Sequence, residues 1–335
     1  MKVDFNNHQY RSQIIPQINA DNFNVIALEL FHYQYHHNKV YKSFVDALHI
    51  LPESVTTIEA IPFLPISFFK THDVISGDKQ PKDAAFFFES SGTSNTINSK
   101  HFVFNPDIYK EAFINGFHQY FGRPEDYIIL ALLPSYLERQ NSSLVYMMQA
   151  LMKLSAHPAN GCYLNEWSAL AATIKDLKTK NRKVLLLGVT YALLDFAEAF
   201  PMSLENVIVV ETGGMKGRKE EWTRNRVHEF LIEKWQLQNV QSEYGMTELL
   251  SQAYSFRHGV FHPASTMKVM VRDINDPLSH SFAGSGCLNI IDLANIESCA
   301  FIATEDVGIV QKDGCFEVLG RMDHAALRGC SLMTF

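Results

Sequence analysis

The chain has 335 residues, of which 47% are hydrophobic and 19% charged, and its 36 acidic side chains outnumber the 29 basic ones. A chain of this length can bury a large core, in one large domain or in two ordinary ones. The net charge of −7 argues against a general binder of nucleic acids or anionic membranes, because both polyanions would be repelled.

The first region, residues 1–83, is predicted to be helical and to pack on the rest of the chain. Its start, MKVDFNNHQY, is too polar for a signal peptide, and no segment has the ~18 apolar residues of a membrane span, so we expect no stable membrane anchor. Apolar residues from Val25 to Leu48 recur on a broad face and predict a helix over residues 23–48. Pro62 and Pro65 then predict an extended connector.

The second region, residues 84–265, is predicted to be an α/β core. Short apolar runs alternate with helix-length segments, which indicates layers of helices around a largely parallel sheet. Because these runs are apolar at consecutive positions, we expect central strands that are buried on both faces. The predicted strands are 84–89, 127–134, 183–190 and 206–214, and the predicted helices lie near 107–121, 142–154, 166–180, 191–200 and 219–236.

The third region, residues 266–324, is predicted to be a β-rich subdomain. Four strand-like runs, MKVMVRDI, GCLNIIDL, CAFIATEDVGIV and GCFEVLGR, are joined by connections too short for helices. A tail, residues 325–335, follows and carries Cys330.

Two loops that follow predicted strands have the composition of phosphate-binding loops. Residues 89–95 place small hydroxyl side chains around a glycine, so that N–H groups and hydroxyls can surround phosphates, although ordinary polar turns have the same composition. Residues 211–218 contain paired glycines, which let a flat ligand approach the backbone closely. Lys216 and Arg218 of the same loop could bind anionic oxygens. A glycine-rich connection between a strand and a helix is the structural alternative there.

Two further segments and the tail add groups that suit a nucleotide and a nucleophile. Residues 242–248 combine an aromatic ring, a glycine, a hydroxyl and a carboxylate, which suit a base and Mg²⁺. Asp306 can accept both hydroxyls of a ribose, and Arg321 can donate to the sugar or to a phosphate. Cys330 lies close to Arg328, and a thiol beside a cation is a good nucleophile, although a lone cysteine is more often idle.

Taken in order, these segments resemble the adenylate-forming superfamily, which contains acyl-CoA synthetases, firefly-type luciferases and peptide-synthetase adenylation domains. The resemblance spans about residues 84–330, and within the superfamily the chain is most similar to the acyl-protein synthetase (LuxE-type) branch, with phenylacetate-CoA ligases next. The residues that carry the similarity to that branch are 61–70, 133–139 and 328–332. The implied fold is α/β: the large N-terminal domain of the adenylate-forming fold, with layered α/β subdomains and a β-rich, barrel-like subdomain, without the small C-terminal domain.

The resemblance also implies an ATP site with Mg²⁺. Asp306 and Arg321 would bind the ribose, while Thr247 and Glu248 would hold phosphate and metal, and Lys216 would supply positive charge. The loop that closes over the phosphates would be formed by Ser90, Ser91, Gly92, Thr93 and Ser94. The residues around the adenine would be Gly213, Gly214 and Tyr244, with Gly245 and Met246 in the same motif.

The implied reaction is that of a ligase that forms a carbon–sulfur bond. A small carboxylic acid, by resemblance a fatty acid, is activated to acyl-AMP with release of pyrophosphate. A thiol, by the same resemblance that of Cys330, then takes the acyl group for delivery to a reductase or another acyl-accepting partner.

Departures from the superfamily pattern leave two alternatives open. Asn95 replaces the usual second glycine of the phosphate loop, and the small C-terminal domain with its lysine is missing. The alternatives are a standalone ligase that acts on CoA or a carrier protein, and a nucleotide-binding scaffold without turnover. The five scattered cysteines indicate free thiols and a cytoplasmic location. The acid, the final acceptor and the oligomeric state stay open.

Overall fold

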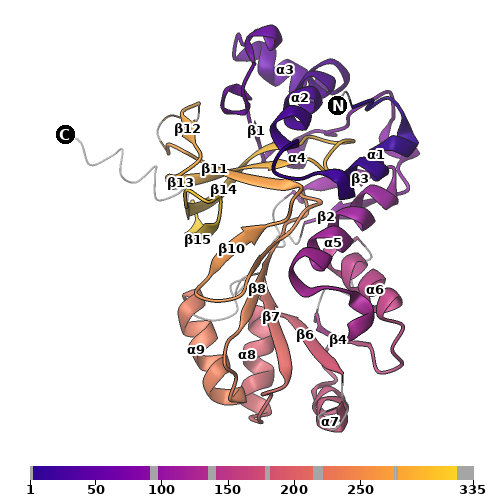
Figure 1. Cartoon of the computed structure of the whole chain (residues 1–335), viewed down its shortest axis with the longest axis vertical. Helices are drawn as coiled ribbons and strands as arrows, with labels where there is room; N and C mark the ends of the chain where they lie inside the picture. Colours follow the sequence, from indigo (N-terminus) through magenta and orange to yellow (C-terminus); the bar gives the residue numbers. More distant parts are fainter. Residues whose placement is uncertain are drawn as a thin grey trace, which may run out of the picture.

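The computed structural model describes residues 3–90, 97–134, 141–177, 182–213, 222–274, 276 and 278–322, which form helices layered on a large mixed sheet (Figure 1). The α-helices are α1 (His8–Ile14), α2 (Phe23–His37), α3 (Lys39–Ala47), α4 (Phe68–Thr71), α5 (Pro106–Phe121), α6 (Ser143–Ser155), α7 (Trp167–Leu177), α8 (Thr190–Ala199) and α9 (Arg224–Trp235). The strands are β1 (Leu64–Pro65), β2 (Phe86–Glu89), β3 (Lys100–Val103), β4 (Tyr127–Leu132), β5 (Gly161–Tyr163), β6 (Lys183–Val189), β7 (Val207–Thr212), β8 (Gln241–Tyr244), β9 (Ala253–Ser255), β10 (Val260–Pro263), β11 (Met267–Arg272), β12 (His280–Ser281), β13 (Gly284–Asp292), β14 (Phe301–Val310) and β15 (Phe316–Arg321).

Most strands belong to one continuous sheet, which has 13 strands among the described residues. Their order is β12-β11-β13-β14-β15-β10-β9-β8-β7-β6-β4-β5, and β1 pairs with β14 beside this path. Along this order, pairing is parallel from β5 to β8 and antiparallel from β8 to β12, whereas β1 pairs with β14 in parallel. The predicted fold class, an α/β core followed by a β-rich segment, is therefore confirmed. The domain boundary at residue 265 stays a prediction, since the change of pairing falls between β8 and β9.

The parallel part of the sheet reverses its winding between β4 and β6. Helix α6 leads from β4 out to β5, whereas α8 and α9 lead in the other direction, from β6 to β7 and from β7 to β8. Right-handed crossovers in opposite directions place helices on opposite faces of a sheet. Helix α6 packs on β4 and α8 packs on β6 and β7, and Figure 1 shows the two helices on different sides. Ligands bind at the carboxyl ends of strands beside such a reversal.

The helix predicted over residues 23–48 is two helices. Asn38 has an extended backbone between α2 and α3, and its side-chain oxygen caps α3 by accepting from Tyr41 N at 3.0 Å. The Asn38 amide also donates to Ser298 O at 3.0 Å, so a contact distant in sequence fixes the break. Val25, expected on the apolar face, is 50% exposed.

The strand predicted at 84–89 is not a central strand of the parallel sheet. Within the described residues, β2 pairs with β3 in a separate two-stranded antiparallel sheet and is mostly half-buried. A consecutive apolar run predicts burial but does not identify the strand's partner, and here the partner is the next segment along the chain. Glu89 and Ser90 therefore reach the site from a hairpin.

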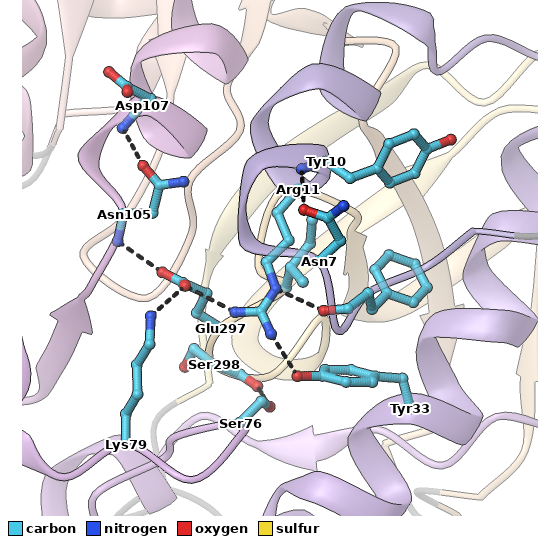
Figure 2. Close-up of polar contacts among 12 residues, drawn as sticks. Asn7, Tyr10, Arg11, Tyr33, Ser76, Lys79, Asn105, Asp107, Glu297 and Ser298 are labelled. Atoms are coloured by element: carbon cyan, nitrogen blue, oxygen red, sulfur yellow. Dashed lines mark hydrogen bonds and ion pairs between the residues drawn. The ribbon is translucent and has the colours of Figure 1, made fainter.

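A buried ion network joins the N-terminal helices to the connection between β13 and β14. The Glu297 carboxylate accepts from Arg11 Nη1 at 2.9 Å, from Lys79 Nζ at 2.9 Å and from Asn105 N at 2.8 Å. Arg11 donates further to Phe5 O and to the Tyr33 hydroxyl. Figure 2 shows Arg11 and Lys79 on the Glu297 carboxylate, with Tyr33 beside Arg11. The network ties α1 and α2 to the start of α5.

Across the described ranges, every helix is too short or too polar to cross a lipid bilayer.

Candidate functional site

A polar pocket of about 110 Å³ lies at the carboxyl ends of β7 and β8. The predicted residues Gly213, Gly245, Met246 and Thr247 line it, and so does Glu89, which precedes the serine-rich loop. The lining also includes Tyr109 of α5, Leu144 and Met147 of α6, Thr212, Glu243 and Gln252. Segments that are far apart in the sequence therefore meet at one place, one strand away from the reversal in winding.

The three groups predicted around the nucleoside converge. Tyr244 at the end of β8 donates its hydroxyl to Asp306 Oδ2 at 2.7 Å, and Arg321 Nε donates to Asp306 Oδ1 at 3.2 Å. Asp306 and Arg321 are paired across β14 and β15, which fixes their separation. Burial raises the pKa of Tyr244 well above its usual value, so its hydroxyl stays a donor. Because each carboxylate oxygen can accept more than one hydrogen bond, Asp306 keeps capacity for sugar hydroxyls.

The turn that follows β8 holds Thr247 and Glu248 in place. The His101 ring, from β3, donates Nδ1–H to Thr247 O at 3.0 Å, since a carbonyl can only accept, and Asn295 Nδ2 donates to Glu248 O at 2.9 Å. Burial lowers the pKa of His101 to about 4, so the ring is neutral at physiological pH. Burial raises the pKa of Glu248, while a hydrogen bond from Ser99 and the charges of Arg321 and Lys70 oppose that rise.

The donor set at this turn suits Mg²⁺. In the described residues no three His, Cys, Asp or Glu side chains gather into a cage for a metal ion. Mg²⁺ is commonly held by one or two carboxylates together with substrate phosphates rather than by such a cage. The Glu248 carboxylate and the Thr247 hydroxyl supply hard oxygen ligands of this kind. Glu248 is itself not among the residues that line the pocket.

Ser90 closes the base of the predicted phosphate loop. Ser90 N donates to Ser99 O at 3.1 Å, and Ser90 Oγ accepts from Ser99 N at 2.9 Å. Ser91, Gly92, Thr93 and Ser94 lie outside the described residues. Ser90 and Ser99, which directly follow β2 and precede β3, are therefore bonded to each other where the described part of this connection begins and ends.

The glycine loop after β7 is described as far as Gly213. The φ of Gly213 is +75°, a conformation that favours glycine, and its carbonyl accepts from Thr190 Oγ1 at 3.2 Å. Before it, the buried Glu211 accepts from Thr190, Ser242 and Arg224, so this carboxylate is bound within the fold. Gly214 and Lys216 lie outside the described residues.

Cys330 also lies outside the described residues. The other cysteines, Cys162, Cys287, Cys299 and Cys315, are free thiols. Burial raises the pKa of each, to about 12 for Cys299 and about 11 for Cys315, so these thiols are weak nucleophiles at neutral pH.

Sequence reasoning missed two buried residues of the pocket wall, Glu243 and Gln252. Glu243 is 7% exposed and accepts a short hydrogen bond from Thr212 Oγ1; burial raises its pKa to about 7. Gln252 is 4% exposed, and its Oε1 atom has no hydrogen-bond partner in the described structure. Glu243 stands next to Tyr244 within residues 242–248, and the signal that could have found it is a charged side chain inside a buried strand.

Comparison with known proteins shows which proteins this chain and its fold resemble. A curated protein of Vibrio harveyi, long-chain-fatty-acid–luciferin-component ligase, is 22% identical over 328 residues, which cover 90% of this chain and 84% of the relative. A solved structure of 2-hydroxyisobutyryl-CoA ligase with 2-HIB-AMP and CoA superposes with a TM-score of 0.62 at 13% identity, over 96% of this chain and 70% of that one. The chain has the adenylate-forming fold. The resemblance predicted from the sequence is thereby confirmed.

A second neighbour with the adenylate-forming fold is the ATP-bound RpMatB-BxBclM chimera B3. Its TM-score is 0.53 at 16% identity, over 73% of this chain and 50% of the chimera. No family model matches the chain. The likeness to these structures concerns the fold, so the roles of individual residues rest on the geometry above.

Proposed function

We propose that this protein is an ATP-dependent ligase that activates a carboxylic acid as acyl-AMP and transfers the acyl group to a thiol. The observation that carries the proposal is the junction of the Tyr244, Asp306 and Arg321 side chains, in which Tyr244 stands in the chain between the pocket residues Glu243 and Gly245. Such a cluster suits a ribose, and the neighbouring hydroxyls suit phosphates.

Support for the ligase class comes from the relatives. The Vibrio harveyi protein is by name a ligase of long-chain fatty acids, and the solved neighbours include a CoA ligase with an acyl-AMP and an enzyme with ATP bound. We extend ATP, a carboxylic acid of the fatty-acid type and Mg²⁺ to this chain as parts of the proposal. CoA is the acceptor in the alternative form of the same proposal.

In the first step, the substrate carboxylate attacks the α-phosphorus of ATP. A carboxylate oxygen–phosphorus bond forms, the bond to the β-phosphate bridging oxygen breaks, and pyrophosphate leaves with the electron pair. Both reactants are anions, so the site must align them and supply positive charge. Asp306 and Arg321 would orient the ribose, and Lys216 would face the phosphates. Thr247 and Glu248 would hold Mg²⁺, which when bound neutralises phosphate charge.

In the second step, the Cys330 thiolate attacks the acyl carbonyl. A carbon–sulfur bond forms, the bond between the carbonyl carbon and the AMP oxygen breaks, and the thiol proton passes to solvent. Cysteine suits this role because its thiolate is strongly nucleophilic. The thioester would then serve a reductase or another acyl-accepting protein, in the cytoplasm, where free thiols persist.

The test is the intact mass of the protein after incubation with Mg²⁺-ATP and a pool of carboxylic acids, for the parent chain and for Cys330→Ser. We expect an ATP-dependent mass increase that hydroxylamine removes and that Cys330→Ser lacks. Pyrophosphate release that requires added CoA or carrier protein, equal in both chains, would assign the acyl group to that acceptor instead. ATP binding without pyrophosphate release for any acid would reject the ligase and leave a nucleotide-binding scaffold. Cys162→Ser serves as the matched control.

A further inference from the structure

The strand that carries Asp306 leaves its regular pairing just before that residue. Where β13 pairs with β14, the register shifts between Cys287 and Asn289. Between these two residues only Leu288 stands opposite residues 304–306, so β14 bulges here. A β-bulge bends its strand and turns a side chain to a new direction. The shape of this bulge therefore determines where the Asp306 carboxylate points.

A buried guanidinium pairs with the backbone groups that the bulge takes out of the ladder. Arg272 of β11, which is 9% exposed, donates Nη2 to Thr304 O at 2.5 Å and Nη1 to Leu288 O at 3.2 Å. Nη1 also donates to the side-chain oxygen of Asn289 at 2.7 Å. A buried carbonyl without a donor is costly, and the guanidinium presents its donors in a rigid, planar fork. One arginine side chain therefore holds both sides of the bulge.

The Thr304 side chain extends this arrangement to Asp306. Thr304 is fully buried, and its hydroxyl donates to Leu288 O at 2.8 Å and accepts from Asp306 N at 3.2 Å. Leu288 O thus accepts from both Arg272 and Thr304. Arg272 is therefore joined to the backbone of Asp306 through Leu288 and Thr304.

The charge of Arg272 is not explained by an ion pair. The ion pairs within the described residues do not include Arg272, whereas the buried Arg11 pairs with Glu297. A buried charge costs free energy unless it is paired, and an apolar side chain of similar size would avoid that cost. Packing alone therefore does not account for a cation at this position, whereas the carbonyl groups of the bulge do.

We propose that Arg272 is a positioning residue for the nucleoside, whose guanidinium holds the bulge that directs the Asp306 carboxylate towards the ribose hydroxyls. This rests on the ribose role of Asp306 in the proposed function. On the other edge of β14, Asp306 pairs with Arg321 of β15 and accepts from its Nε. The carboxylate is thus held by Arg321, while the backbone that carries it is held by Arg272.

The experiment compares the dissociation constants of ATP and of dideoxy-ATP, which lacks both ribose hydroxyls, by equilibrium dialysis. In the parent chain we expect ATP to bind at least about tenfold more tightly, because the analogue cannot donate to the Asp306 carboxylate. Arg272→Met keeps most of the side-chain volume and removes the donors, so this ratio should fall at least about fivefold. Arg272→Lys keeps one charged donor group and should recover part of the ratio.

The exposed Arg257, in the turn between β9 and β10, provides the matched control Arg257→Met, which should leave the ratio unchanged. Thr304→Val interrupts the same path at a second residue and should also lower the ratio, so it decides the question if Arg272→Met does not fold. A general structural role of Arg272 would weaken the binding of both nucleotides by the same factor. An unchanged ratio of that kind would overturn the proposal.

ATP–pyrophosphate exchange with a pool of carboxylic acids, run on the same chains, separates this proposal from the ligase function. Exchange by the parent chain, with a ratio that Arg272→Met leaves unchanged, would overturn the role of Arg272 and leave the ligase standing. A ratio that falls in Arg272→Met, although no acid supports exchange, would reject the ligase and support the role of Arg272. Equal binding of the two nucleotides by the parent chain, or binding of neither, would reject the ribose role of Asp306 and the role of Arg272 with it.

Discussion

Two glutamates of this protein are equally buried and differ in their partners. Glu297 is 6% exposed and accepts from Arg11, Lys79 and the backbone of Asn105 (Figure 2). Glu243 is 7% exposed and, in the described residues, accepts from one neutral hydroxyl, that of Thr212. Glu297 joins segments that are 286 residues apart, from Arg11 onward, whereas Glu243 lines a pocket.

The difference separates a structural carboxylate from one that is available for a ligand. Burial removes water from both groups, and the fold replaces that water with two cations and an amide for Glu297. At Glu243 the replacement is incomplete, and burial raises the pKa of its carboxyl to about 7. Buried groups with shifted pKa values in a pocket are candidates for function, on the condition that geometry supports them.

The largest effect is expected for Glu297→Gln. The change leaves the guanidinium of Arg11, which is 3% exposed, without its opposite charge. Breaking a buried pair in this way lowers the free energy of unfolding by about 3–5 kcal/mol. Urea unfolding at pH 8 measures it, with Glu205→Gln as the exposed control. A loss no larger than that of the control would show that the network contributes nothing to stability.

The same substitution at Glu243 should have the opposite sign. The carboxyl has a pKa of about 7 in the folded chain and 4.5 as its ordinary value, so the folded state holds a proton between these pH values that the unfolded state has lost. Stability therefore falls as pH rises from about 4.5 to about 7, and Glu243→Gln removes this loss. We expect the variant to exceed the parent chain by about 1–3 kcal/mol at pH 8 and to match it below pH ~4.5.

The measurement for Glu243→Gln is urea unfolding at several pH values between 4.5 and 8. A variant that is less stable than the parent chain at pH 8 would mean that Glu243 is already satisfied, as Glu297 is, and would end the contrast between them.

The part of the fold that depends on local pattern could be predicted from the sequence. The apolar runs of β4, β6 and β7 are buried along nearly their whole length, as consecutive apolar residues indicate. Which segment each strand or helix end contacts could not be predicted in the same way, because it depends on residues that are distant in the sequence. The break at Asn38 needs Ser298, and the removal of β2 from the main sheet needs β3.

The candidate site likewise has a part that the sequence predicts and a part that only the folded structure shows. The Tyr244, Asp306 and Arg321 cluster was predicted because aromatic, acidic and basic residues in a recurring order carry a recognisable resemblance, and the structure brings these three side chains together. Glu243 and Gln252 carry no such signal. Their importance lies in how few partners the fold gives them: Glu243 has one described donor, Thr212, and Gln252 Oε1 has none, which is a property of the folded chain alone.

The smallest effect is expected for His101→Gln, which tests a third kind of buried group, one with a single backbone partner. The His101 ring donates to Thr247 O, and its pKa is lowered to about 4 from an ordinary 6.5, mainly because burial disfavours the charged form. The unfolded chain therefore binds a proton at this residue between pH 6.5 and about 4 that the folded chain does not, and stability falls as pH falls through that window. Glutamine does not titrate and can still donate, so at pH 8 we expect the free energy of unfolding to be lower by about 1 kcal/mol because of altered packing and geometry.

Urea unfolding of both chains is the measurement, and this deficit should shrink as pH decreases from 6.5 to 4. A deficit that stays constant over this range would mean that the folded protein binds a proton at His101 as readily as the unfolded one, so that the Thr247 turn is open to water.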